Sequence, residues 1–414
     1  MACLWHGFQG LILHRGYPYN TFLFQPSLRF TDFTIVVNAA HMRNPYRADG
    51  SVYFPLAYSF LRWIRPEKIF MSLFFGTILV GILFLLDISL RPLSENKADE
   101  DGIPNVRLVG IPFLLLLYPF WYCLDRGNIE FLLVLLVGAF VYLLARRRYR
   151  GALACLVPAI CFKIYPAVLL ALYLRRGRMR WIVIGLVSAF TLSFLSLASF
   201  PGSWHANWQI LQKHLAAFNL SHAIGNGSLD GTSTLWNPYK VILGFMHFQT
   251  FEGNWDWQAI PHDVLLYHQR IYSVCMAVGA IGVTGYVCFV ETELLRRGVL
   301  LLIYMVISSP IGADYKLLHA GTALCALILL STRRHHDLLV VGFLSVALIP
   351  MKEWLLPFLG FTDDLFTEVS IGIFLAPLAL LLAAGFLMWD GFRQWNPHWG
   401  WQRVKNLLSP LRRA

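Results

Sequence analysis

VPAICFKIYP, residues 157–166, interrupts a long apolar stretch near the middle of the 414-residue chain. Pro158 and Pro166 stand on either side of Lys163, and a proline inside a helix removes a backbone hydrogen bond and crowds the preceding turn. A lysine at such a break is poorly placed to reach the aqueous interface and well placed to hold an anion. The stretch therefore predicts a broken helix with a functional cation at the break.

Basic clusters on both sides determine how this stretch lies in the membrane. RRRYR at residues 146–150 and RRGRMR at 175–180 are hard to translocate, so both are expected on the cytoplasmic side. Residues 151–174 must then leave that side and return to it. A helix rises only about 1.5 Å per residue, too little to cross a core of about 30 Å twice over this length. The sequence predicts a re-entrant hairpin of two short helices with Lys163 near its tip.

The same arrangement recurs between LLRRG at residues 294–298 and RRHH at 333–336. Two short apolar arms flank SSPIGADYK, which puts Asp314 and Lys316 near a second tip. Lys316 either pairs with Asp314 or offers a second cation for a phosphate site. His319, next to this tip, is a polar contact, a proton carrier or simply a buried histidine. Because non-helical backbone at membrane depth is tolerated only in protein or beside a watery cavity, the two tips indicate a site.

The composition is that of a polytopic membrane protein. Hydrophobic residues make up 57 % of the chain and charged residues 14 %, with a mean hydropathy of +0.57. Short polar or basic segments separate the apolar runs, which predicts one all-α membrane domain over residues 1–414. The net charge of +11 comes from clusters at the ends of these runs, so topology explains it and nucleic acid is not expected as a partner.

The other apolar runs fit one path that alternates between the two sides of the membrane. On this path residues 14–67 form a first external loop, residues 201–270 a long external loop and residues 391–414 an amphipathic cytoplasmic tail. WHANWQILQKHLAAF, residues 204–218, has the apolar spacing of a helix on the outer membrane surface. The predicted spans are residues 69–90, 108–124, 128–145, 181–200, 271–290, 338–351 and 368–389.

RFTDFTIVVNAAHMRNPY, residues 29–46, holds a single acid, Asp32, in the first external loop. Asp32 begins a pattern typical of a short amphipathic helix, and an aspartate there commonly caps the helix. The other interpretation is a general base that accepts a proton from a hydroxyl nucleophile. Composition does not decide between them. The D-x-D pair typical of metal-bound nucleotide sugars is absent here, so neither a metal nor a cofactor is expected.

DRGN, residues 125–128, joins two spans with almost no loop. This predicts a tight turn in which Asp125 and Asn128 cap helix ends. Glu130 lies one turn into the next apolar helix, where a carboxylate is costly unless it faces a partner or a cavity. Arg126 is the nearest candidate partner.

Three stretches carry a resemblance to a known family. The first, GYPYNTFLFQPSLRFTDFTIVVNAAHMRNPYRADGSVYFPLAY, has Asp32 after an apolar stretch, then Asn-Pro-Tyr at 44–46 and Tyr-x-Pro-Leu at 53–56. The others are DRGNIE at 125–130 and FKIYPAVLL at 162–170. In this order they resemble the integral-membrane GT-C glycosyltransferases of glycosyltransferase family 87 (DUF2029). This bacterial group includes polyprenol-phosphate-mannose-dependent mannosyltransferases.

The resemblance implies a GT-C-like helical bundle that takes a sugar, expected to be mannose, from a polyprenyl monophosphate carrier. The acceptor would be a lipid or glycan on the external, periplasmic face of a bacterial plasma membrane, and the transfer would proceed with inversion. Asp32 would be the base. Lys163, Lys316 and Arg126 would bind the donor phosphate. The residues expected around the substrates are Asp125, Asn128, Glu130, Tyr165, Asp314, Tyr315 and His319.

Two other functions fit parts of the sequence. A transporter or flippase for a lipid-linked sugar would also have charges at broken helices, but the chain shows no repeated halves and its charges gather toward one face. An O-antigen polymerase or ligase usually carries several arginines in a large external loop, whereas residues 201–270 contain only Lys213, Lys240 and Arg270 as basic residues of the Lys/Arg type.

Proteins of the GT-C group normally begin with a full transmembrane helix, so we expect one upstream of Met1.

Overall fold

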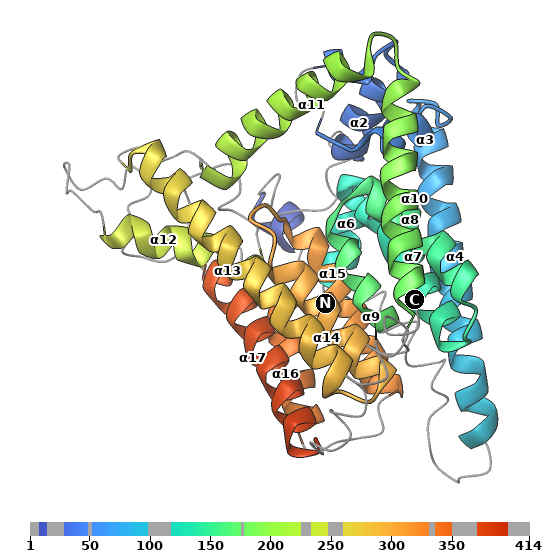
Figure 1. The fold of residues 1–414 in the computed structure, drawn as a ribbon, viewed down its shortest axis with the longest axis vertical. Helices are drawn as coiled ribbons and strands as arrows, with labels where there is room; N and C mark the ends of the chain where they lie inside the picture. The colour runs from blue at the N-terminus through green and yellow to red at the C-terminus, as the bar shows by residue number, and fades with distance from the viewer. Residues whose placement is uncertain are drawn as a thin grey trace, which may run out of the picture.

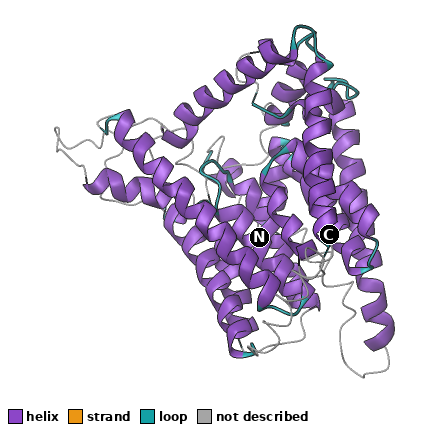
Figure 2. Ribbon diagram, viewed as in Figure 1, coloured by secondary structure: helices purple, strands orange, loops and turns teal. Residues whose placement is uncertain are grey.

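The computed structural model describes residues 8–14, 29–48, 52–97, 117–174, 178–224, 233–246, 260–330, 336–349 and 371–395. The regular structure of these residues is helical, and no strand occurs among them (Figure 2). The predicted all-α fold is confirmed. The expected cytoplasmic tail lies outside the described residues beyond residue 395.

The helical elements follow one another along the chain; the α labels are those of Figure 1, and η marks a short 3-10 or π turn. They are η1 (Phe8–Ile12), α2 (Thr31–His41), η3 (Pro45–Arg47), α3 (Pro55–Leu61), α4 (Lys68–Lys97), α6 (Tyr118–Arg126), α7 (Glu130–Ala145), α8 (Tyr149–Phe162), η4 (Tyr165–Leu170), α9 (Ala171–Leu174), α10 (Met179–Ala198), α11 (Trp204–Phe218), η5 (Asn219–Ile224), α12 (Trp236–Met246), α13 (His262–Phe289), α14 (Leu294–Ile307), η7 (Asp314–Lys316), α15 (Leu317–Leu330), α16 (Asp337–Ala347) and α17 (Gly372–Arg393).

Four of the described helices are long and apolar enough to cross a membrane: α4 over Lys68–Ser89, α10, α13 and α17. Each overlaps a predicted span, although α13 begins at His262 rather than at residue 271. Shorter apolar helices pack with them. The 16 residues of α7 extend only about 24 Å, less than a hydrocarbon core of about 30 Å. The chain is therefore an all-α polytopic membrane protein that combines full spans with shorter helices.

The helices form two neighbouring groups (Figure 1). In one group α7 packs on α8 and α4, and α8 packs on α10; in the other α14 packs on α15 and α17, and α16 on α17. Contacts of α15 with α6 and α7 join the groups, and one continuous apolar core runs through both. Helix α11 leaves the top of α10 and runs across toward α12 and α13 (Figure 1).

The first broken hairpin is confirmed, but its break is more local than the two prolines suggested. Pro158 lies inside α8, which continues to Phe162. The helix ends at Lys163, whose backbone is extended (φ −148°, ψ 133°), and η4 restarts at Tyr165 with Pro166 in its first turn. Proline fits a first helical turn because no intrahelical N–H is needed there. Lys163 therefore lies at the point where the chain turns back.

The second broken hairpin is also confirmed. Helix α14 ends at Ile307, the single turn η7 follows over Asp314–Lys316, and α15 returns against α14. Residues 308–313 between these elements form no helix. Lys316 is the last residue of η7 and lies directly before α15, as predicted for the second tip.

Helix α11 forms over the predicted residues, and its N-cap Ser203 accepts a hydrogen bond from Ala206. Trp204 and Trp208 are exposed. The Asn-Pro-Tyr motif anchors this region, because the Asn44 amide donates to Asn207 of α11 at 2.8 Å. This bond ties the segment after α2 to α11, a structural role for the motif. The position of α11 on a membrane surface stays a prediction.

A buried charge cluster, here the Arg296 cluster, joins the starts of α14 and α16 to the end of α17. The Arg296 guanidinium contacts Asp337, Asp390 at 3.2 Å and Glu291 at 3.6 Å. His336 contacts Asp390 as well. Because buried carboxylates are costly without a cation, Arg296 stabilises the packing of three helices at this end of the bundle.

Candidate active site

The Asp32 carboxylate is held by two side chains from a distant part of the chain. Its Oδ1 accepts a hydrogen bond from the Arg126 guanidinium at 2.5 Å, and its Oδ2 accepts one from the Asn128 amide at 3.2 Å. Asp32 does not cap its helix: α2 begins one residue earlier, and its N-cap residue, Phe30, makes no side-chain cap. The capping interpretation of Asp32 is therefore wrong. Its side chain is 23 % exposed, so the carboxylate is oriented yet accessible.

Arg126 and Asn128 both belong to the turn between α6 and α7. Gly127 adopts a left-handed conformation (φ 63°), which ends α6 and reverses the chain. A Cβ at Gly127 would lie 2.9 Å from the Cβ of Phe33, so only glycine allows this close approach to α2. The Phe30 amide donates to the Asp125 carbonyl at 2.9 Å and fixes the same contact. The predicted tight turn is confirmed.

Glu130 is the centre of a second set of contacts. It is fully buried, and it accepts hydrogen bonds from the Lys163 ammonium at 2.7 Å and from the Tyr165 hydroxyl. His319 lies 3.1 Å from its other oxygen. The partner predicted from sequence was Arg126; the structure instead directs Arg126 to Asp32. His319 is a polar contact, one of the roles expected for it.

Asn128 links the two sets. Its side-chain oxygen accepts hydrogen bonds from the Glu130 amide at 3.2 Å and from the Lys163 ammonium at 3.4 Å, while its amide donates to Asp32. It therefore stabilises the start of α7, as predicted. A continuous network leads from Asp32 through Asn128 to Lys163 and Glu130.

Each hairpin tip places a lysine over a tyrosine ring of the other tip. The Lys163 ammonium lies 5.3 Å from the ring centre of Tyr315 on the second tip, and the Lys316 ammonium lies 4.7 Å from that of Tyr165 on the first. Contacts of this kind stabilise a desolvated ammonium by about 2 kcal/mol. Lys163 also faces Tyr53, 5.5 Å away, and burial raises the pKa of the Tyr53 phenol to about 12, so this ring stays neutral. The tips thus form one unit.

Lys316 differs from the other cations of the site. Its side chain is buried, 5 % exposed, and its ammonium donates to the backbone carbonyl of Ile311 at 2.7 Å. Among the described residues no carboxylate pairs with it, and its contacts do not include the expected ion pair with Asp314. Arg126 is matched by Asp32 and Lys163 by Glu130. Of these three cations, Lys316 is therefore the one that has no carboxylate partner among the described residues.

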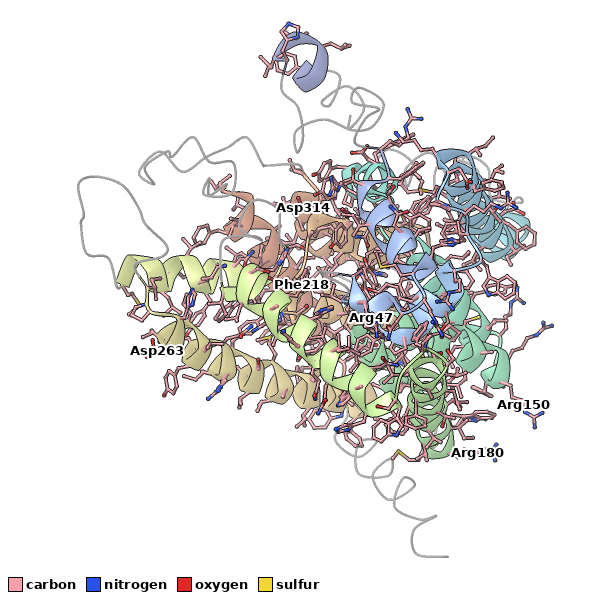
Figure 3. The ribbon with its side chains drawn as sticks, turned by 90° about the horizontal axis from the view of Figure 1, so that it is seen from above. Arg47, Arg150, Arg180, Phe218, Asp263 and Asp314 are labelled. Atoms are coloured by element: carbon pink, nitrogen blue, oxygen red, sulfur yellow. The ribbon has the colours of Figure 1, made fainter. Side chains whose placement is uncertain are left out.

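Two of the expected residues lie at the margin of this network. The Asp125 side chain is buried, and its role in the α2 contact comes from its backbone carbonyl. Asp314 is partly buried at the start of η7 and lies toward the middle of the bundle seen from the α11 end (Figure 3). Tyr53 was missed as a site residue, although its Tyr-x-Pro-Leu motif was recognised in the sequence.

The comparison with known families identifies the chain. The model of Glycosyltransferase family 87 matches residues 52–310, more than half of the sequence. The chain belongs to glycosyltransferase family 87. This family 87 protein is thus a membrane glycosyltransferase. No curated protein matches it significantly. The matched residues of the family 87 protein include Tyr53, Glu130 and Lys163, whereas Asp32 and Lys316 lie on either side of them.

Proposed function

We propose that the protein transfers a sugar, expected to be mannose, from a polyprenyl-phosphate carrier to a hydroxyl group of a lipid or glycan acceptor. The observation that carries this proposal is the buried Lys316 at the second hairpin tip, which pairs with no carboxylate among the described residues. Burial lowers the pKa of Lys316 to about 7, and a bound anion would keep its amine charged. Lys316 is a buried ammonium whose described contacts are a carbonyl and an aromatic ring. A buried cation without a matched anion is unfavourable. The phosphodiester monoanion of a lipid-linked sugar would balance the charge.

The arrangement supports a direct displacement. The acceptor oxygen would bond to the anomeric carbon of the sugar while the bond from that carbon to the phosphate oxygen breaks. Its electron pair leaves with polyprenyl phosphate, and Asp32 takes the hydroxyl proton. Attack opposite the leaving group inverts the anomeric centre. Arg126 and Asn128 orient the Asp32 carboxylate, which leaves lone pairs on both oxygens for the acceptor.

The leaving phosphate gains negative charge as the bond breaks. Lys316 and Lys163 lie at adjoining tips, and preorganised cations stabilise such charge most strongly where water is excluded. Lys163 also bonds Glu130, which fixes its position and leaves a further donor on its ammonium. Glu130 is thus a positioning residue for Lys163.

The proposed active site faces the outside of the cell, which in a bacterium is the periplasmic side of the plasma membrane. Arg150, near the start of α8, and Arg180, near the start of α10, are exposed at the edge of the bundle (Figure 3). Both belong to clusters expected in the cytoplasm. Lys163 lies at the opposite end of α8, about 20 Å away along a helix of 14 residues.

The test is sugar transfer by the purified full-length protein in lipid nanodiscs. Radiolabelled polyprenyl-phosphate-mannose, polyprenyl-phosphate-glucose and a nucleotide-linked mannose are offered separately with a membrane lipid extract as acceptor. We expect transfer only from a polyprenyl-phosphate sugar. Transfer from the nucleotide sugar alone would overturn the proposed donor. Movement of labelled donor across liposomes without any transfer would favour a flippase instead.

A further inference from the structure

A pair of buried hydroxyl groups lies beside the second hairpin tip, outside the network that joins Asp32 to Lys163. Ser233 and Thr234 directly precede Leu235 and α12, and both side chains are completely buried. Their oxygens form no hydrogen bond within the described part of the chain. Leaving a buried hydroxyl unsatisfied is unfavourable, so two neighbouring cases call for an explanation.

The segment that carries these two hydroxyl groups is fixed against the tip that carries Lys316. The Leu235 amide donates to the carbonyl of Ile307, the last residue of α14, at 3.1 Å. The point where a Cβ of Gly312 would lie is 2.6 Å from Cγ2 of Thr234 and 3.4 Å from the ammonium of Lys316. Thr234 and Lys316 therefore flank Gly312, which has no side chain to separate them.

We propose that Ser233 and Thr234 donate hydrogen bonds to the non-bridging phosphate oxygens of the polyprenyl-phosphate donor, beside the charge supplied by Lys316. This inference rests on the proposed function and adds two residues to its donor site. A hydroxyl can turn its proton toward an anion, and O–H donors to an ionised oxygen are among the stronger hydrogen bonds. An ammonium with adjacent neutral donors matches a phosphodiester, which has one negative charge and several acceptor atoms.

The arrangement also accounts for Gly312. Any side chain there would push Thr234 away from Lys316, because a Cβ contact of 2.6 Å is too short to persist. Glycine therefore lets the Thr234 side chain and the Lys316 ammonium approach the same point from two sides. The segment after the long external loop thereby becomes part of the site, and α12 anchors it through the Trp236 ring nitrogen, which donates to the Ala223 carbonyl at 2.6 Å.

The experiment measures binding of a short-chain polyprenyl monophosphate to the full-length protein in nanodiscs, for wild type, Ser233→Ala, Thr234→Val and Gly312→Ala. We expect Ser233→Ala and Thr234→Val each to weaken the Kd about tenfold, as for loss of one hydrogen bond to a charged group. Gly312→Ala should weaken it as well, because its Cβ would displace Thr234. The matched control is Thr322→Val on α15, whose hydroxyl already bonds the Leu318 carbonyl of its own helix at 2.9 Å. This control should bind as the wild type does.

A second readout separates a ligand-binding hydroxyl from a structural one. Without ligand, Thr234→Val should unfold at the wild-type temperature or above it, because the substitution removes an unsatisfied group. Unphosphorylated polyprenol should bind wild type and Thr234→Val equally weakly, and millimolar inorganic phosphate should not shift the melting temperature of either.

Three outcomes would overturn this inference but leave the proposed function standing. The first is wild-type affinity for polyprenyl monophosphate in Ser233→Ala and Thr234→Val, and the second is a loss of polyprenol binding in these variants equal to their loss of polyprenyl monophosphate binding. The third is a raised KM for the acceptor with donor binding intact. Inorganic phosphate that bound as tightly as the lipid would assign the site to free phosphate. If the wild-type protein bound no polyprenyl monophosphate, the proposed function itself would fail, and the donor role of these hydroxyl groups with it.

Discussion

The pair formed by Glu130 and Lys163 gives the most quantitative prediction about the site. Breaking a buried ion pair by removing one partner costs about 3–5 kcal/mol, whereas removing both partners costs much less. Glu130 is fully buried and Lys163 lies 2.7 Å away. Glu130→Gln and Lys163→Met should each lower the free energy of unfolding by an amount in this range. The double variant should lose less than the sum of the two, by about 1–3 kcal/mol.

The assay is the melting temperature of the purified protein in one detergent. With an unfolding entropy of about 2.1 cal/mol/K per residue, a chain of 414 residues loses about one degree for each kcal/mol. Each single variant should therefore melt about 3–6 °C below wild type. Lys213→Met on the exposed face of α11 is the control and should stay within about half a degree. Strictly additive losses in the double variant would refute the pairing of Glu130 with Lys163.

Three further predictions test other parts of the structure. Arg296→Met leaves the three carboxylates of the Arg296 cluster without their buried arginine, so the same melting assay should show a loss of about 3–5 kcal/mol; an unchanged melting temperature would mean that the cluster is not buried. Gly127→Ala strains a left-handed turn and collides with Phe33, so sugar transfer should fall about ten- to a hundredfold; full activity would contradict the role of this turn in holding the site. In a cysteine-free background, a membrane-impermeant maleimide should label Trp204→Cys in intact cells and Arg150→Cys only after permeabilisation; the reverse pattern would invert the topology.

The sequence predicted the broken hairpins because their cause is local. Basic clusters bound each hairpin, the enclosed length is too short for two crossings, and Lys163 and Lys316 mark the interruptions. The exact break needed the structure. Pro158 is accommodated inside α8, whereas Pro166 lies in the first turn of η4, so only one of the two prolines lies at a helix boundary.

The partners of the charged residues could not be read from spacing. Arg126 lies close to Glu130 in sequence, but the left-handed Gly127 turns the chain between them. Arg126 consequently faces Asp32, 94 positions away, and Glu130 faces Lys163 and, from the second hairpin, His319. Such pairings depend on how whole helices pack, which no local pattern encodes.

For Asp32 and the Arg296 cluster as well, the sequence did not predict the partners of the charged side chains. An aspartate at the start of a helical pattern fits a cap, yet the left-handed Phe30 starts α2 one residue earlier and leaves the carboxylate for Arg126. Arg296 belongs to a basic cluster that predicts a surface loop, but its side chain is buried. Its partners Asp337 and Asp390, at the ends of two apolar helices, were the available signal.

The central claim is that Asp32 removes the proton from the acceptor hydroxyl. The most direct measurement is the rate of sugar transfer by Asp32→Asn, with polyprenyl monophosphate binding measured on the same preparation. An asparagine keeps the shape and a hydrogen-bond acceptor but cannot take up the proton. The account predicts that transfer falls by about a hundredfold or more, the typical contribution of a general base, while the Kd for polyprenyl monophosphate stays within about threefold. Transfer at the wild-type rate in Asp32→Asn would contradict it.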